Sequence, residues 1–173
     1  MPSSENRFLL NLHRSIHPKS PPPLSMPDTQ QNMNDFACTS VSEVARTPWR
    51  FVSLQQAQQL CARSGKRLPT NDEWYAVASA MGDQSQCNTD STGVAASGAT
   101  PCTTQSGVYD MVGNLWEWID GEVTEGVYNS RALPESGYVN LVDSDGVVVK
   151  TAAVASEEYG SDYANTNLTG VYG

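Results

Sequence analysis

Two carboxylates flank a glycine in the segment Gly107–Gly121, which reads GVYDMVGNLWEWIDG. Asp110 precedes Gly113 and Glu117 follows it, and a glycine at that point permits a positive φ or a close backbone approach. Carboxylate and backbone carbonyl oxygens are the ligands that calcium prefers, in a flexible geometry. The segment therefore predicts a calcium site. The alternative is structural, with the two carboxylates capping the chain or pairing with Arg67 or Lys66 inside the fold.

The four cysteines include no Cys-x-x-Cys pair, so a structural zinc site is not expected. Cys87 and Cys102 bracket a polar loop. A disulfide between them would contribute about 3 kcal/mol by restricting the unfolded chain, provided that the compartment is oxidising. Two unpaired thiols are the alternative, and the sequence does not decide between the two.

Charge and residue placement disfavour several classes of function. The formal charge is −9, and residues 107–173 hold 11 of the 19 acidic residues, so this half repels nucleic-acid phosphates. No apolar run approaches the roughly 18 residues that a membrane span needs. Both histidines lie within the first 17 residues, so a Ser-His-Asp or Cys-His site later in the chain would lack its base. We expect neither a nucleic-acid partner nor a membrane span.

Two amphipathic helices are expected to position these segments, and the first is predicted over residues 54–64. Residues 53–56, Ser-Leu-Gln-Gln, form a capping box in which Ser53 and Gln56 each accept a hydrogen bond from the other's backbone amide. Apolar residues then recur at helical spacing, and Gly65 suits the left-handed residue just past the helix end.

The second helix is predicted to begin at Thr70, because Pro69 prevents one continuous helix. Residues 70–73, Thr-Asn-Asp-Glu, form another capping box. Apolar residues follow at the spacing of one helix face: Trp74, Val77, Ala78 and Met81. Trp74 is therefore assigned to the core and not to a ligand-binding surface.

Outside the helices the chain is expected to be irregular, with a few short strands. Residues 83–106 form a long polar loop. Trp116 and Trp118 alternate with their neighbours in strand fashion, which assigns both to the core. Tyr138–Val142 and Gly146–Thr151 are predicted to form a hairpin, because an Asp-Gly pair between them favours a turn.

The first 35 residues are expected to differ from the remainder. Residues 1–35 are rich in Ser, Pro, Asn and Gln and show neither helical nor strand periodicity. Such a segment cannot bury enough apolar surface to offset its ordering. We predict a disordered tail over 1–35 and a single domain over 36–173.

The order of these features resembles that of the formylglycine-generating-enzyme-like, or sulfatase-modifying-factor, family. GKRLPTNDEWYAVASA at 65–80 and GVYDMVGNLWEWIDG at 107–121 follow one another as they do in that family, and the resemblance covers residues 51–121. It implies an α+β fold of the C-type-lectin-like class, with two amphipathic helices, short antiparallel strands and much irregular loop.

The resemblance also implies a calcium ligand set. In the family this segment supplies a calcium site, and the ligands here would be the side chains of Asp110 and Glu117 with the backbone oxygens of Gly113 and Leu115.

Catalytic members of the family oxidise a sulfatase cysteine to formylglycine and bind copper(I) through two cysteines near the C-terminus. Copper(I) needs thiolate ligands, yet the last cysteine here is Cys102, upstream of the Trp-Glu-Trp motif. We expect the chain to lack the family's C-terminal segment, so copper would bind only if that segment supplied the cysteines. No catalytic residue is assigned, and an incomplete sheet would expose edges that favour self-association.

These features leave three functional hypotheses. The first is a parent protein that is a copper- and oxygen-dependent oxidoreductase forming formylglycine, with this chain alone inactive. The second is a non-catalytic lectin-like module, stabilised by calcium, that binds a ligand, a peptide or another protein. The third is a domain retained for assembly within a larger bacterial surface protein. No signal peptide is visible; the compartment stays open, with an extracytoplasmic or cell-surface location favoured.

Overall fold

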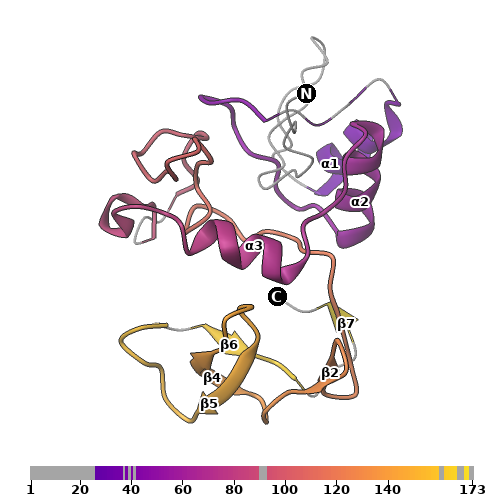
Figure 1. Ribbon diagram of the computed structural model, residues 1–173. Coiled ribbons are helices and arrows are strands. Elements are labelled where there is room, and N and C mark those ends of the chain that lie inside the picture. Colours follow the sequence, from indigo (N-terminus) through magenta and orange to yellow (C-terminus); the bar gives the residue numbers. More distant parts are fainter. Residues whose placement is uncertain are drawn as a thin grey trace, which may run out of the picture. The chain divides into compact units, whose positions relative to one another are not determined.

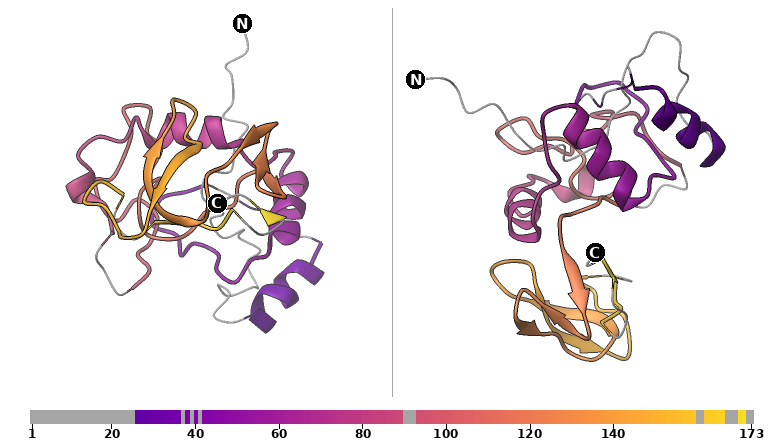
Figure 2. Two further views of the ribbon diagram at one scale, coloured as in Figure 1. Left: turned by 90° about the horizontal axis from the view of Figure 1, so that it is seen from below. Right: turned by 90° about the vertical axis from the view of Figure 1, so that its right-hand side faces the viewer.

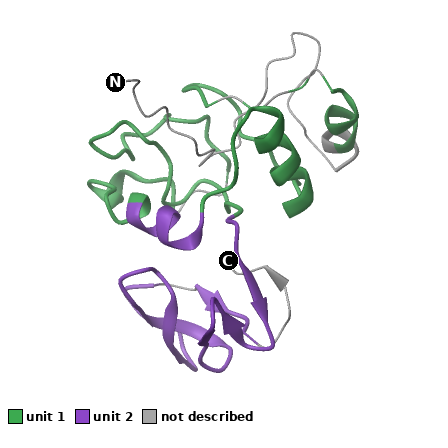
Figure 3. Cartoon of the chain, turned by 45° about the vertical axis from the view of Figure 1, so that its right-hand side comes forward, with its two compact units in different colours: residues 1–69, 77–118 green, residues 70–76, 119–173 purple. Residues whose placement is uncertain are grey.

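The computed structural model describes residues 26–36, 38, 40, 42–89, 93–159, 162–166 and 170–171. The chain divides into two compact units, residues 1–69 with 77–118 and residues 70–76 with 119–173 (Figure 3). Helices and two small antiparallel sheets are both present, so the fold is α+β, as predicted. The single domain predicted over residues 36–173 stays a prediction. No helix among the described residues is long and apolar enough to cross a membrane.

Helix α2, Leu54–Arg63, confirms the first predicted helix (Figure 1). The Ser53 hydroxyl accepts a hydrogen bond from the Gln56 amide at 3.3 Å, and the Gln56 side chain accepts one from the Ser53 amide at 2.9 Å. Both halves of the capping box are therefore formed. The inward face of the helix is fully buried at three positions: Ala57, Leu60 and Cys61.

Helix α1, Met26–Asn34, corrects the prediction of a disordered tail over residues 1–35. Met33 is 5% exposed and packs with two buried residues of the same unit, Trp49 and Leu60. The sequence shows no strong apolar periodicity here. Contacts with residues distant in the chain stabilise this helix more than an amphipathic stripe does, so its sequence did not predict it. The first 25 residues of the predicted tail lie outside the described residues.

Helix α3, Asn71–Ala78, confirms the second predicted helix, although it ends before Met81. The Thr70 amide donates to the Glu73 carboxylate at 2.9 Å, which is one half of the predicted capping box. The Thr70 hydroxyl donates instead to the Asp72 carboxylate. Met81 is buried and belongs to an isolated β-bridge with the polar loop, so its burial does not depend on the helix.

The second unit contains two antiparallel sheets, seen from two directions in Figure 2. The first has the strand order β3-β2-β1-β7, built from β1 (Glu122–Thr124), β2 (Val127–Tyr128), β3 (Arg131–Ala132) and β7 (Gly170–Val171). The second has the order β5-β4-β6, built from β4 (Gly137–Val142), β5 (Val148–Ala152) and β6 (Tyr163–Ala164). Buried residues form two clusters in this unit: Val123 and Tyr128 of the first sheet pack with Val147, which directly precedes β5, and Val139, Val148 and Ala164 of the second sheet pack together.

The β4–β5 pair confirms the predicted hairpin over residues 138–151. The Asp143 carboxylate accepts hydrogen bonds from the amides of Asp145 and Val147 at 2.9 and 3.0 Å. Gly146 takes a φ of 73°, which a glycine adopts without strain. A side-chain acceptor and a left-handed glycine therefore close the turn, as the sequence indicated.

Candidate functional site

Residues 107–118 of the predicted calcium segment belong to the first unit and form an irregular loop, not a strand. Asp110, Gly113 and Asn114 have positive φ angles of 60°, 78° and 63°. Three of five consecutive residues are thus left-handed, a conformation that favours glycine and asparagine and strains most other residues. The strand alternation assumed from the sequence cannot continue through such a backbone.

Asp110 is the buried carboxylate of this loop, with 4% of its surface exposed. Its Oδ2 accepts a hydrogen bond from the Gly98 amide at 2.7 Å, and its own amide donates to the Cys102 carbonyl at 3.0 Å. Burial raises the pKa of this carboxyl, and the Gly98 hydrogen bond acts in the opposite direction. A carboxylate deprived of water in this way is stabilised by a cation.

Gly113 and Asn114 fasten the loop to the segment that follows Cys87. A Cβ atom at Gly113 would lie 2.7 Å from the Asn88 carbonyl oxygen, so only glycine fits there. The Asn114 amide donates to the same carbonyl at 3.0 Å. The Asn114 Oδ1 accepts from the Asn88 side chain at 3.1 Å and from the Ala95 amide at 2.9 Å. Asn114 was not among the predicted site residues, although an asparagine after a glycine is a signal for left-handed backbone.

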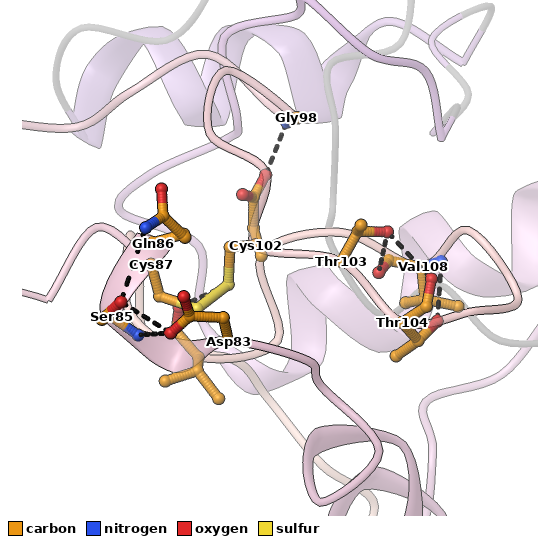
Figure 4. Close-up of a disulfide and its surroundings, with 11 residues drawn as sticks. Asp83, Ser85, Gln86, Cys87, Gly98, Cys102, Thr103, Thr104 and Val108 are labelled. Atoms are coloured by element: carbon orange, nitrogen blue, oxygen red, sulfur yellow. Dashed lines mark hydrogen bonds between the residues drawn. A yellow bond between two sulfur atoms is a disulfide. The ribbon is translucent and has the colours of Figure 1, made fainter.

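The sulfur atoms of Cys87 and Cys102 are joined by a disulfide, so of the two alternatives that the sequence left open the structure has the bridge (Figure 4). Cys102 is 1% exposed, and its carbonyl receives the Asp110 amide. Before Cys87, Asp83 caps the short 3-10 helix η1 (Gln84–Gln86) by accepting a hydrogen bond from the Ser85 amide at 3.0 Å. The bridge therefore ties the Asp110 loop to the segment that contacts Asn114.

The remaining residues of the predicted calcium set lie further along the same loop. The Gly113 carbonyl accepts a hydrogen bond from the Leu115 amide at 2.8 Å, and Glu117 is half-buried. The described residues contain no group of three or more His, Cys, Asp or Glu side chains that could hold a metal ion. An ion here would depend on backbone oxygens as much as on carboxylates. Such a mixed set of hard oxygens is the chemistry that calcium prefers, so the residues fit the ion in kind.

Two tryptophans of the segment do not lie in the predicted core. Trp116 is 89% exposed and Trp118 is 36% exposed. The Trp118 indole N–H donates to the Val52 carbonyl at 2.7 Å, which orients the ring without burying it. The core assignment assumed a strand, and this stretch forms none. Ile119 is the buried residue instead, and Trp74 in α3 is half-buried.

The four cysteines do not fit copper(I). Cys87 and Cys102 share the disulfide, and Cys38 and Cys61 are thiols that are completely buried. Burial raises the pKa of Cys61 to about 11, while the charge of Lys66 acts in the opposite direction. Copper(I) binds thiolates, which require deprotonation and access. The disulfide leaves Cys87 and Cys102 without a thiol, and the buried thiols of Cys38 and Cys61 lack access.

Comparisons with known proteins agree with the motifs. No family model matches the chain, and no solved structure matches it. The protein named Inactive C-alpha-formylglycine-generating enzyme 2 is 27% identical over 129 residues in Bos taurus and 25% identical over 129 residues in Mus musculus. Each match covers 61% of this chain, and 43% and 42% of the two relatives, so the chain spans less than half of their length. The resemblance to the formylglycine-generating-enzyme-like family is thereby confirmed.

Proposed function

We propose that this chain, a relative of the formylglycine-generating-enzyme-like proteins, acts as a non-catalytic, lectin-like binding module that calcium stabilises. The observation that carries the proposal is the state of the cysteines: two form a disulfide and two are completely buried. Oxidation of a substrate cysteine through copper needs accessible thiolates, and the residues of this chain offer none. The word inactive in the names of both relatives supports the same assignment.

Calcium is proposed as a structural ion of the Asp110 loop. Asp110 is buried and its Oδ2 accepts a hydrogen bond from the Gly98 amide, and Gly113 brings the backbone against Asn88. The disulfide fixes one end of this arrangement. The ion would offset the cost of burying the Asp110 charge, and Glu117 would complete its charge balance from the other side of the loop.

A C-type-lectin-like fold is the architecture that we propose for this module. It is supported by the two capped helices, the short antiparallel strands and the long irregular loops of an α+β chain. Such loops are where binding residues concentrate in proteins.

The calcium part is tested by thermal unfolding during a calcium titration of three proteins: wild type, Glu117→Ala and Glu43→Ala. The control removes a carboxylate that is exposed in the same unit and paired with Arg46. An ion that binds only the folded state raises the free energy of unfolding by about 2.7 kcal/mol when its concentration is a hundred times its dissociation constant. We expect this gain in wild type and in Glu43→Ala, and a much smaller one in Glu117→Ala. Equal responses of all three proteins would remove the assignment.

The catalytic part is tested by incubating the chain with copper(I), oxygen and a peptide that contains one cysteine. Mass spectrometry then follows the conversion of that cysteine to formylglycine. We expect no conversion above that of copper and peptide without protein. Conversion that requires the chain would establish an oxidase and contradict the non-catalytic role.

A further inference from the structure

The Cys87–Cys102 disulfide is connected to the Asp110 loop at both of its ends, within the first unit. At one end, the Cys102 carbonyl accepts a hydrogen bond from the Asp110 amide at 3.0 Å. At the other, the Asn88 carbonyl accepts one from the Asn114 amide at 3.0 Å, and the Asn88 side chain donates to Asn114 Oδ1 at 3.1 Å. The bridge therefore holds together two stretches of chain that bond to different points of the same loop.

The segment between the two cysteines also supplies donors to the Asp110 loop. The Gly98 amide donates to Asp110 Oδ2 at 2.7 Å, and the Ala95 amide donates to Asn114 Oδ1 at 2.9 Å. The Ala95 carbonyl accepts a hydrogen bond from Asn114 Nδ2 at 3.3 Å in return. Once the bridge opens, these partners belong to a segment with more conformational freedom. Each contact with the Asp110 loop then costs more entropy than it does in the closed form.

The two sulfur atoms of the bridge differ in their access to solvent. Cys87 is half-buried, whereas Cys102 is 1% exposed. A disulfide is cleaved by attack of a thiolate on one sulfur, and access decides which sulfur is attacked. A thiolate from solvent therefore reaches Cys87, and Cys102 is the leaving group. The Cys102 sulfur lies 3.6 Å from the Val112 carbonyl, which can accept the S–H that this reaction creates.

We propose that this disulfide is a redox switch of the Asp110 loop: the oxidised chain binds calcium, and reduction by a dithiol weakens that binding. One thiolate of the dithiol bonds to Cys87 Sγ, the S–S bond breaks, and its electron pair and then a proton go to Cys102 Sγ. The second thiolate of the dithiol attacks its own sulfur in the mixed disulfide and releases Cys87 as a thiol. Two electrons and two protons thus pass to the chain, and the dithiol becomes a disulfide. The inference rests on the calcium site of the proposed function.

The size of the effect has a reciprocal form that can be measured. Coupling between two sites of a protein typically changes affinity by roughly 5-fold to 150-fold, and we expect reduction to weaken calcium binding about tenfold. Linkage requires that calcium disfavour reduction by the same factor, because calcium stabilises the oxidised form. Saturating calcium should therefore lower the reduction potential of the bridge by about 30 mV, the equivalent of a factor of ten for a two-electron couple.

The experiment is a calorimetric titration of the whole chain with calcium, first oxidised and then reduced by dithiothreitol. Cys87→Ser is the matched control: it should bind calcium as weakly as reduced wild type and should not respond to the reductant, because Cys38 and Cys61 are already thiols. Amide NMR signals of α2 show whether the reduced unit is still folded, and they should persist. A redox titration against dithiothreitol, with and without calcium, measures the shift in potential on wild type alone, so the test does not depend on the folding of the variant.

The attacked sulfur is identified by trapping with glutathione, followed by alkylation and peptide mass mapping. We expect glutathione on Cys87 and the alkyl group on Cys102, and the reverse pattern would overturn the route described above. Equal calcium affinity of the oxidised and reduced chains would refute the switch and leave the calcium site intact. Loss of the α2 signals on reduction would also refute it, because the bridge would then control the folding of the whole unit. An oxidised chain that binds no calcium would refute the calcium site itself, and the switch with it.

Discussion

Cys87→Ser opens the disulfide that closes the polar loop of the first unit. The two cysteines are 15 residues apart. Closing a loop of that length removes conformational entropy from the unfolded chain worth about 3 kcal/mol at 25 °C. Cys102 is 1% exposed whereas Cys87 is only half-buried. The serine at position 87 therefore breaks the bridge and leaves the buried sulfur in place, so the loss should stay near the entropic value.

The assay is urea unfolding followed by tryptophan fluorescence. Three of the four tryptophans, Trp49, Trp116 and Trp118, belong to the first unit and report its unfolding. Wild type under a reducing agent should lose the same free energy as Cys87→Ser, and the variant should not respond to the reducing agent. This reasoning is refuted if the free energies of unfolding of wild type and Cys87→Ser differ by less than about 0.5 kcal/mol while their denaturant dependence is equal.

The local consequence is measurable by hydrogen exchange. The Asn114 amide donates to the Asn88 carbonyl, one residue after the bridge, whereas the Ala57 amide donates to Ser53 at the start of α2. Opening the disulfide should speed exchange at Asn114 more than at Ala57, because only the first hydrogen bond depends on the closed loop. Equal acceleration at both amides would mean that the bridge stabilises the unit uniformly.

Three further perturbations have defined outcomes. Gly146→Ala should destabilise the second unit by about 2 kcal/mol or more in thermal unfolding, because the added Cβ would lie within 2.7 Å of the Tyr75 ring and the backbone there has a φ of 73°. Gly93→Ala is the control, because a Cβ atom at Gly93 would meet open space. Asn114→Ala removes three side-chain hydrogen bonds and should lower the free energy of unfolding in urea by about 2 kcal/mol. A loss near zero would contradict the role of Asn114 in fastening its loop to Asn88 and Ala95. Burial holds the pKa of Cys61 at about 11 against an ordinary 9.0, so the folded thiol stays protonated while the unfolded one ionises, and stability is lost as pH rises from 9 to 11. Cys61→Val should remove about 3 kcal/mol of that pH dependence, and an unchanged slope would exclude this thiol as its source.

Local signals predicted the parts of the fold that depend on neighbouring residues. The capping box at Ser53 and the turn closed by Asp143 are satisfied within a few residues, so the sequence alone contains their physical cause. Helix α1 was missed because Met33 is stabilised by Trp49, which lies beyond the reach of any local pattern. Strands of two or three residues, such as β1 and β2, carry too few alternations to be recognised.

The backbone geometry of the candidate calcium site could not be predicted from the sequence, and the site itself stays a prediction. Asp110 and Gly113 were chosen for their chemistry, and the structure gives both a left-handed backbone. The same backbone prevents the strand that would have buried Trp116. The contact of Asn114 with Asn88 joins residues 26 positions apart, so it could not be inferred from local spacing.

Helix α3 has a consequence for how this protein can be cut into fragments. Residues 70–76 belong to the second unit although 42 residues of the first unit, 77–118, follow them along the chain. A gene fragment that encodes 119–173 alone would omit the Asn71 side chain, which donates a hydrogen bond to the Asp145 carbonyl. The units are therefore not interchangeable cassettes. A recombinant second unit would need α3 supplied as a separate peptide, and recovery of the hairpin signal on adding that peptide would measure how strongly the two pieces assemble.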